Sequence, residues 1–205
     1  MIIHDLTGQE THTSYQNLAA SNELRHYEFL RSIVEAALAL DKQFLSQTVL
    51  KALNFHAIAC LHSNAGMYRP CRVTVGNKND FPEPWQIPDL MDDFVNSVNR
   101  RWTDSDALYL AAFVLWRLNW IHPFINGNGR IARAACLFVL CLKSGGWPPY
   151  SPILPELIRQ NRDKYIDILK VIDKSNCNGE LDLQPIIVFL FKLLQQQVDS
   201  EQTPQ

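Results

Sequence analysis

The chain has 205 residues, a formal net charge of −2, and a composition that is 47% hydrophobic and 20% charged. These values fit one globular domain with short tails and exclude a chain that is disordered throughout. No surplus of Lys and Arg calls for nucleic acid as a partner, and no run of basic residues calls for a membrane surface.

The cysteines and the first residues of the sequence indicate in which cellular compartment the protein is expected. The five cysteines are an odd number and no two of them form a CxxC pair, which fits a reducing environment. The opening stretch MIIHDLTGQE lacks the basic and apolar regions of a signal peptide, and the apolar stretches fall short of the ~20 residues that a membrane span needs. We therefore expect a cytoplasmic protein without a membrane span. Export by a machine that reads a folded or C-terminal signal would leave no mark in such a sequence.

Hydrophobic periodicity predicts helices along most of the chain. Residues 1–20 are polar and mixed, so we expect an N-terminal arm, then one domain over 21–197 and a disordered tail over 198–205. Ser21 or Asn22 is a plausible cap for the first long helix. The expected helices are 21–41, 43–61, 87–102, 107–120, 127–142, 156–173 and 182–197.

One segment departs from this helical pattern. The run from Arg72 to Val75 alternates in polarity and is followed by a Gly-Asn-Lys-Asn turn, which predicts a small β-hairpin over 67–76. The stretches 107–120 and 127–142 are apolar nearly all round, which marks two buried central helices. The predicted fold class is therefore an all-α bundle around these two helices, with one hairpin as a flap.

The ten residues IHPFINGNGR, from Ile121 to Arg130, join the two central helices. Pro123 disfavours the right-handed helical region for the residue before it, so the first helix should end near His122. The two glycines let the backbone approach a ligand closely. Asn126 is a suitable N-cap for the second helix, whose first turn offers free N–H groups and the positive end of the helix dipole.

Two arginines lie where the helix dipole disfavours them. Arg130 and Arg133 are three residues apart in the first turn, where a cation costs about 0.3–1 kcal/mol. An anion between the arginines and the helix end would remove that cost. With His122 at its edge, the loop predicts a cradle for a di- or triphosphate and a general base beside it. The alternative is that each residue has only an ordinary structural role, as a cap or an ion-pair partner.

The segment HPFINGNGR resembles the signature of the Fic (Fic/Doc) family, which reads HPFx, then Asp or Glu, then GNGR. The GMYR stretch before the motif and the GGWPP stretch after it also fall where that family has them. The resemblance covers about residues 21–197 and implies the helical fold of the family. It also implies a protein adenylyltransferase, which moves AMP from ATP to a Tyr, Thr or Ser hydroxyl of a target protein.

By position, the resemblance assigns a role to each motif residue. His122 would be the base that takes the hydroxyl proton, a contribution of about 10²–10⁴-fold in rate. The phosphates of the nucleotide would be held by Gly127, Asn128, Gly129, Arg130 and Arg133. The flap that positions the target segment would contain Met67, Tyr68, Arg69, Val73 and Val75.

Position 126 departs from the family pattern. The family has Asp or Glu there as a ligand of Mg²⁺, or of Mn²⁺ in its place, whereas this chain has Asn126. An amide oxygen still ligates a hard cation, but more weakly than a carboxylate does. Three outcomes stay open, ranked in this order: slow AMP transfer with a weakened metal, transfer from another donor or at another phosphorus atom, and a nucleotide-binding regulatory module with little or no transferase activity. On this basis Asn126→Asp is expected to raise metal-dependent transfer.

Two further features bear on regulation and metals. Many relatives carry an inhibitory [Ser/Thr]xxxGlu[Gly/Asn] motif, and no glutamate of this chain has Ser or Thr four positions before it. The resemblance therefore implies either an antitoxin-like inhibitor acting in trans or an activity mild enough to need none. His56, Cys60 and His62 cluster on a predicted helix, but without a further ligand we expect a packed helix surface there.

Overall fold

The computed structural model describes residues 1–149 and 151–201, and within these ranges the chain is all-α, as predicted. In chain order the elements are α1 (Ile3–Thr7), α2 (Thr13–Ala39), α3 (Gln47–Ile58), the 3₁₀ turn η1 (Pro84–Gln86), α4 (Ile87–Arg100), α5 (Ala107–Ile121), α6 (Asn128–Ser144), α7 (Leu154–Gln160), α8 (Arg162–Cys177) and α9 (Gln184–Glu201).

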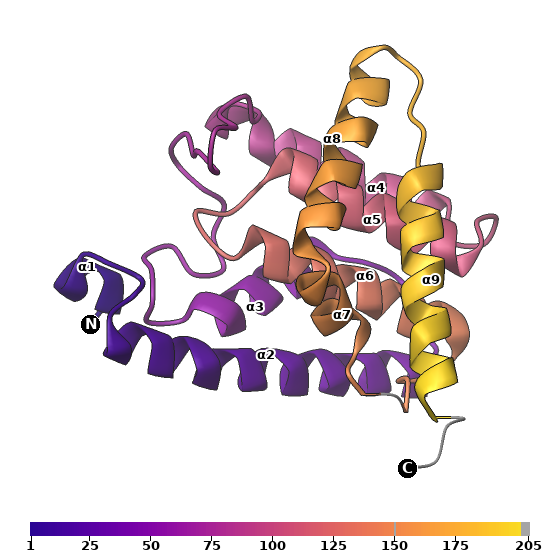
Figure 1. Cartoon of the computed structure of the whole chain (residues 1–205), viewed down its shortest axis with the longest axis horizontal. Coiled ribbons are helices and arrows are strands. Elements are labelled where there is room, and N and C mark those ends of the chain that lie inside the picture. Colours follow the sequence, from indigo (N-terminus) through magenta and orange to yellow (C-terminus); the bar gives the residue numbers. More distant parts are fainter. Residues whose placement is uncertain (150, 202–205) are drawn as a thin grey trace.

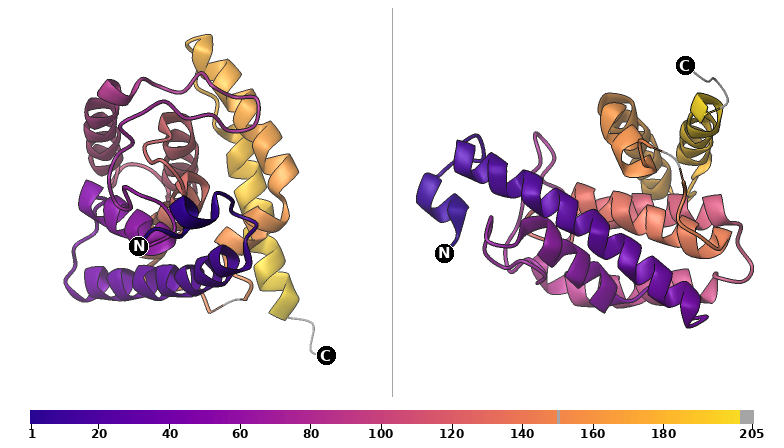
Figure 2. Two further views of the ribbon diagram at one scale, coloured as in Figure 1. Left: turned by 90° about the vertical axis from the view of Figure 1, so that its left-hand side faces the viewer. Right: turned by 90° about the horizontal axis from the view of Figure 1, so that it is seen from below.

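Helices α5 and α6 form the centre of the bundle, as their apolar sequences predict. They pack against each other more extensively than any other pair of elements, and most of their residues are buried. Figures 1 and 2 show α2 and α3 covering one side of α6, while α8 and α9 pack against α5 on another. No helix in the described ranges is long and apolar enough to cross a lipid bilayer.

The first long helix begins earlier than its sequence suggested. Helix α2 starts at Thr13, where the ring of His12 accepts a hydrogen bond from the Ser14 N–H (3.1 Å). The cap expected at Ser21 or Asn22 is wrong, because the Ser21 hydroxyl donates to a backbone carbonyl one turn earlier and so fits inside a helix. The segment expected to be an arm therefore contributes α1 and the first turns of α2.

Two C-terminal elements also differ in extent. The helix expected over 156–173 is interrupted at Asn161, whose backbone (φ −103°, ψ 33°) leaves the helical region and separates α7 from α8. Helix α9 runs to Glu201, into the tail expected at 198–205, and residues 202–205 lie outside the described part of the chain.

The β-hairpin expected over 67–76 is wrong. Residues 67–83, which we call the flap loop, are irregular and contain one reciprocal backbone pair, between Val75 and Lys78 (N···O 2.9 and 3.0 Å). The pairing does not extend away from this turn among the described residues. The strand signal therefore marked an extended segment without a partner strand.

The connection between α2 and α3 is held by one side chain of α4. The Asn99 amide donates to the Leu45 carbonyl (2.8 Å) and accepts from the Leu45 N–H (2.9 Å). Leu45 is fully buried, so water does not satisfy these backbone groups. The amide takes the place that a helix or sheet partner would have.

The variant Asn99→Ala is expected to lower the free energy of unfolding by roughly 1–3 kcal/mol, because it leaves the backbone of a buried residue without partners. Urea unfolding followed by circular dichroism measures this loss. Asn96→Ala, at an exposed position of the same helix, is the control and should stay within about 0.5 kcal/mol of the wild type. Equal losses in the two variants would show that the Asn99 bonds contribute nothing.

Candidate functional site

The connection between α5 and α6 begins with a histidine in an uncommon backbone conformation. His122 caps α5 with φ 52° and ψ 58°, in the left-handed region. Pro123 disfavours the right-handed region for its predecessor, so the helix ends here, as predicted. A left-handed residue other than Gly costs about 1–2 kcal/mol, and the contacts that offset this cost lie in the motif loop, residues 122–128.

The motif loop is closed by the side chain of Asn128. Its Oδ1 accepts from the Phe124 N–H (2.9 Å), and its Nδ2 donates to the Phe124 carbonyl (2.8 Å). Both residues are buried, so this amide satisfies a backbone unit that no helix or sheet reaches. The Asn128 side chain, which was expected at a phosphate, is thus committed to holding the loop.

A second amide, Asn54 of α3, supports the loop from the other side. This fully buried side chain donates to the Asn126 carbonyl (2.9 Å) and accepts from the Gly66 N–H (2.9 Å). Gly127 follows with φ 81°, and a Cβ there would lie 3.2 Å from the Asn54 amide and 3.1 Å from Ile58 Cγ2. Glycine is therefore required at position 127 both for its backbone conformation and for its lack of a side chain.

Arg69 ties the flap loop to the motif loop. Its side chain is 2% exposed and donates to the carbonyls of His122 (2.7 Å), Cys71 (3.0 Å) and Pro82. Its backbone N–H donates to the Pro123 carbonyl (2.9 Å). Burial lowers the pKa of Arg69 from its ordinary value. Arg69, expected in a target-binding flap, thus holds the two ends of the flap loop together against the motif.

The other residues expected in the flap have different surroundings. Met67 and Val75 are exposed, as a surface that meets another protein would be. The Tyr68 hydroxyl donates to Gln47 Oε1 (2.6 Å), and its ring packs against that of Phe124. Met67 and Val75 are therefore free to contact a target directly, whereas Val73 is partly buried and lines a cavity.

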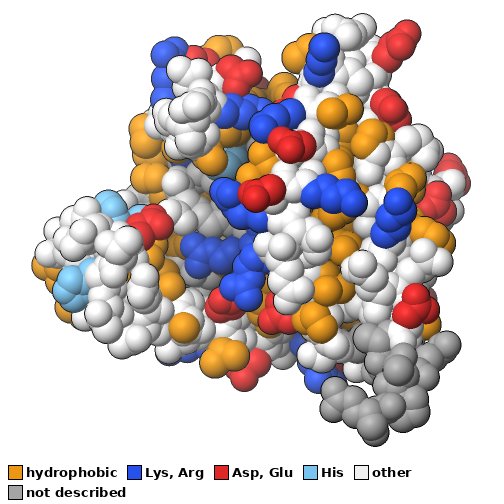
Figure 3. Space-filling model, viewed as in Figure 1, with side chains coloured by type: hydrophobic (Ala, Val, Ile, Leu, Met, Phe, Trp, Pro, Cys, Tyr) orange, Lys and Arg blue, Asp and Glu red, His pale blue; other side chains and the backbone are white. Residues whose placement is uncertain are grey.

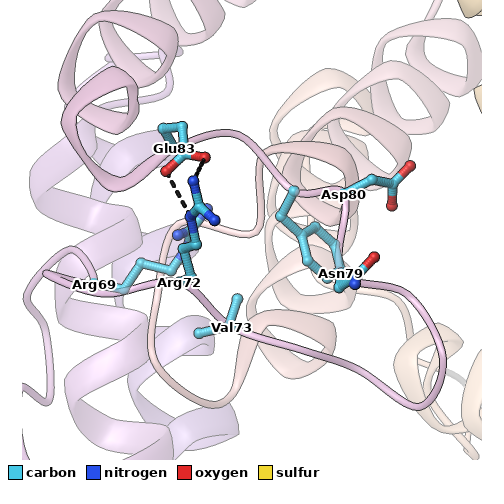
Figure 4. Close-up of a pocket in the computed structure, with 7 residues that line it drawn as sticks. Arg69, Arg72, Val73, Asn79, Asp80 and Glu83 are labelled. Atoms are coloured by element: carbon cyan, nitrogen blue, oxygen red, sulfur yellow. Dashed lines mark hydrogen bonds and ion pairs between the residues drawn. The ribbon is translucent and has the colours of Figure 1, made fainter.

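A cavity of about 160 Å³ opens within the flap loop (Figure 4). On its wall Arg72 and Glu83 form an ion pair (Nε–Oε2 2.9 Å), while the Asp80 side chain points away from that pair. The lining residues are Arg69, Arg72, Val73, Asn79, Asp80, Phe81 and Glu83. Because the Phe81 ring also contacts the His122 ring, the cavity borders the candidate base.

The His122 imidazole is covered by Phe81, with the ring centroids 4.4 Å apart. Burial, together with the nearby charges of Arg69 and Lys78, lowers the pKa of His122 to about 4, although a contact between Nδ1 and the Asn119 carbonyl (3.4 Å) opposes these effects. The ring is therefore neutral at pH 7. With Nδ1 turned to a carbonyl, Nε2 carries the lone pair.

Arg130 is satisfied by the protein itself. Its guanidinium donates to the Ala57 carbonyl (2.8 Å) and to Asn126 Oδ1 (3.1 Å), and burial lowers its pKa. This cation therefore braces α3 against the motif loop. Its charge remains close to the first turn of α6, but its donors are partly used.

Arg133 has no hydrogen bond or ion pair within the described residues, and its Nε is buried without a partner. Its guanidinium lies against Gly129, where a Cβ would be 3.2 Å from Nη1. The N-cap of α6 is Gly127, which offers no capping side chain to the first N–H groups. On the face of the molecule drawn in Figure 3, Lys and Arg side chains gather in a recess near the middle. An unpaired cation at an uncapped helix N-terminus is a site for an anion.

The Asn126 side chain is fully engaged and does not cap α6, so that expectation is wrong. Its Nδ2 lies 3.0 Å from Glu10 Oε1 and 3.0 Å from His62 Nε2, and its Oδ1 accepts from Arg130. The Tyr15 hydroxyl lies 2.7 Å from the same His62 nitrogen. No local sequence pattern indicated that Glu10, His62 or Tyr15 would lie at the motif.

The Asn126 Oδ1 accepts from the Arg130 cation, so Asn126 would ligate a metal ion only if this hydrogen bond were broken. Among the described residues, no group of three or more His, Cys, Asp and Glu side chains could hold a metal ion. His56 stacks on Phe29 (4.3 Å between centroids), as a packed helix surface would. A divalent cation would thus need ligands from a bound nucleotide, as Mg²⁺ commonly has.

Comparison with known sequences identifies similar proteins. Residues 44–140 match the Fic/DOC family. A curated Protein adenylyltransferase Fic from Drosophila willistoni is 29% identical over 182 residues, which cover 87% of this chain and 33% of that protein. The Drosophila virilis protein of the same name is 28% identical. The chain spans about a third of the length of these relatives.

Similar folds occur among solved structures. A Fic domain containing signaling protein from Bacteroides thetaiotaomicron VPI-5482 has a TM-score of 0.72 and 21% identity, covering 96% of this chain and 76% of that chain. Fic-1 from C. elegans has a TM-score of 0.65 and 22% identity, covering 88% of this chain and 52% of that chain. At these identities the likeness establishes a shared fold.

Removing the cover of His122 should change its titration. In Phe81→Ala the pKa of His122 is expected to rise from about 4 toward 6.5, while the charges of Arg69 and Lys78 keep it below that value. Because the buried ring stays neutral while the unfolded chain binds a proton, the wild type gains stability from His122 as pH rises from about 4 to 6.5. The variant should show a smaller gain.

The imidazole resonances in an NMR titration report this pKa directly. Phe81→Leu keeps an apolar cover and serves as the control, with the midpoint near the wild-type value. If Phe81→Ala and Phe81→Leu titrate alike, then Phe81 is not the group that shields His122.

Arg133 should matter to anion binding but not to folding. Charge-assisted hydrogen bonds contribute roughly 1.5–3 kcal/mol, so Arg133→Ala is expected to weaken ATP binding about ten-fold or more. Calorimetry measures the affinity, with Arg100→Ala, an exposed position on α4, as the control. Stability should not fall, since the variant removes a cation that opposes the α6 dipole. Equal affinity in both variants would contradict the cradle.

Proposed function

We propose that the chain transfers AMP from ATP to a hydroxyl side chain of a target protein, because residues 44–140 match the Fic/DOC family. One arrangement carries the proposal: a neutral imidazole, His122, precedes the uncapped N-terminus of α6, and that helix carries an unpartnered cation, Arg133. The curated relatives, which are named protein adenylyltransferases, support the same chemistry.

The reaction forms one bond and breaks another at the α-phosphorus of ATP. The target hydroxyl oxygen bonds to phosphorus, its proton moves to Nε2 of His122, and the bond to the leaving pyrophosphate breaks. His122 is suited to this step because it is already neutral at pH 7. While Phe81 covers the ring it is a weak base, so displacement of Phe81 by the target segment would raise its basicity.

The phosphates would lie at the first turn of α6. The backbone N–H groups of Gly127 and Gly129 and the guanidinium of Arg133 would share their oxygens. Arg130 would contribute its charge while continuing to hold Asn126 Oδ1. Asn128 would act indirectly, by keeping the motif loop closed through its bonds to Phe124.

A bound divalent cation, Mg²⁺ or Mn²⁺, would neutralise charge on these phosphates. No protein cluster holds such an ion by itself among the described residues, so it would arrive with the nucleotide. The steps described above depend on the protein groups alone: His122 for the proton, and Arg133 and α6 for the phosphates.

The acceptor would be a Tyr, Thr or Ser hydroxyl of another protein, positioned along the exposed Met67 and Val75 of the flap loop. An antitoxin-like partner acting in trans belongs to the same proposal, since the chain has no inhibitory motif of the usual form. A nucleotide-binding regulatory module is the second candidate. It is favoured by the closed cover on His122 and by the turn of Asn126 Oδ1 toward Arg130.

Substitution of the proposed base, His122, distinguishes AMP transfer from a regulatory role. With ATP labelled on the α-phosphate, His122→Ala is expected to reduce label transfer to target proteins by about 10²–10⁴-fold, while ATP binding by calorimetry stays close to the wild type. His56→Ala is the control, because His56 is packed on Phe29 away from the motif. Wild-type protein that binds ATP but labels nothing in a lysate would support the regulatory module.

A further inference from the structure

Glu10, in the turn between α1 and α2, places a carboxylate beside the motif loop. Its Oε1 lies 3.0 Å from Asn126 Nδ2 and 3.3 Å from His62 Nε2. The side chain is 55% exposed, so the carboxylate is held at one edge and open at the other. It lies next to the position where the family pattern has Asp or Glu and this chain has an amide.

The segment that carries Glu10 is fixed to the body of the protein. The N–H groups of Ile3 and His4 donate to the carbonyls of Cys60 (2.8 Å) and Leu61 (3.0 Å). The His4 ring packs on the His62 ring, with centroids 4.7 Å apart, and Tyr15 bonds the same histidine. The placement of Glu10 is therefore set by contacts on both sides of it in the sequence.

We infer that Glu10 supplies the carboxylate ligand of the divalent cation that accompanies the nucleotide, in place of the side chain at position 126. This inference rests on the proposed function. Mg²⁺ at nucleotide sites is usually held by one or two carboxylates together with phosphate oxygens and water. A phosphate chain at α6 would also bring negative charge toward Glu10, and a cation between the two removes their repulsion.

This assignment explains the amide at position 126. Asn126 donates to Glu10 through Nδ2 and accepts from Arg130 through Oδ1, so it orients both the carboxylate and the cation. An aspartate has two acceptors and no donor when ionised, and it would face Glu10 at close range. Asn126→Asp alone is therefore expected to disturb the site, contrary to what the sequence suggested.

Mn²⁺ binding to the full chain tests the assignment without reference to catalysis. Electron paramagnetic resonance is used to titrate Mn²⁺ into protein that carries a non-hydrolysable ATP analogue. Glu10→Gln is expected to weaken Mn²⁺ binding about ten-fold or more, since a carboxylate ligand is lost. Glu28→Gln removes the same charge from an exposed position of α2 and should leave binding unchanged.

A double variant that moves the carboxylate from position 10 to position 126 tests the assignment more sharply. The double variant Glu10→Gln with Asn126→Asp moves the carboxylate to the other side of the same hydrogen bond, and Mn²⁺ affinity is expected to recover toward the wild type. ATP-analogue affinity measured in EDTA should be the same in wild type and Glu10→Gln.

Two outcomes would overturn the assignment. Mn²⁺ affinity unchanged in Glu10→Gln would show that Glu10 is no ligand. Tighter metal-free nucleotide binding in Glu10→Gln would show that the carboxylate blocks the phosphate site. Neither outcome bears on AMP transfer, which is followed separately with labelled ATP. Conversely, a chain that binds Mn²⁺ through Glu10 but transfers no AMP would contradict the proposed function while supporting the metal site.

Discussion

The two hydrogen bonds between the Asn128 side chain and the backbone of Phe124 hold an irregular loop at the centre of an all-helical protein. Buried backbone groups outside helices need partners, and an unpaired group costs about 1–3 kcal/mol. Asn54 satisfies the next part of the loop, and Arg69 satisfies the part before it. These three side chains together keep His122 in a left-handed conformation and bring α6 to an uncapped start.

The positive charges around this loop belong to arginines whose hydrogen bonds go to backbone carbonyls or are not all made. Arg69 and Arg130 donate to backbone carbonyl oxygens, and neither forms a direct ion pair with a carboxylate of the described residues. Arg133 has donors left over. The dipole of α6 adds to the same positive potential. The unpartnered donors of Arg133 and the uncapped start of α6 are the physical reason to expect phosphate there rather than a neutral ligand.

The flap loop and the N-terminal segment approach the motif from different directions. Lys78 forms an ion pair with Asp173 of α8 (2.6 Å), which anchors the tip of the flap loop above Phe81 and His122. Glu10 approaches Asn126 together with His62. One segment thus covers the proposed base His122, and the other places a carboxylate next to the proposed phosphate site.

Sequence reasoning located the central helices and the motif because both have strong local signals. All-round apolarity marks α5 and α6, and Pro123 marks the end of α5 at His122. It failed over 67–76, where an alternating stretch met no partner strand. It also missed Glu10 and His62, since nothing local in a polar turn or at a helix end indicates a contact with a residue more than fifty positions away.

The roles of the Asn126 and Asn54 side-chain amides could not be predicted from the sequence either. Asn126 has the residue type of an N-cap, yet its bonds go to Glu10, His62 and Arg130. Asn54 carries no motif at all, although it supports position 126 from α3. Such roles depend on which side chains the packing of α2, α3 and α6 brings together, and no spacing rule contains that information.

A crystal structure of the chain with Mn²⁺ and a non-hydrolysable ATP analogue would show whether nucleotide phosphates bind at α6, because the phosphates and the anomalous signal of manganese locate both ligands. We expect phosphate oxygens within hydrogen-bond distance of the first N–H groups of α6 and of Arg133, with manganese between the phosphates and Glu10. Nucleotide bound elsewhere, for example in the cavity of the flap loop, with Arg133 still unpartnered, would contradict it.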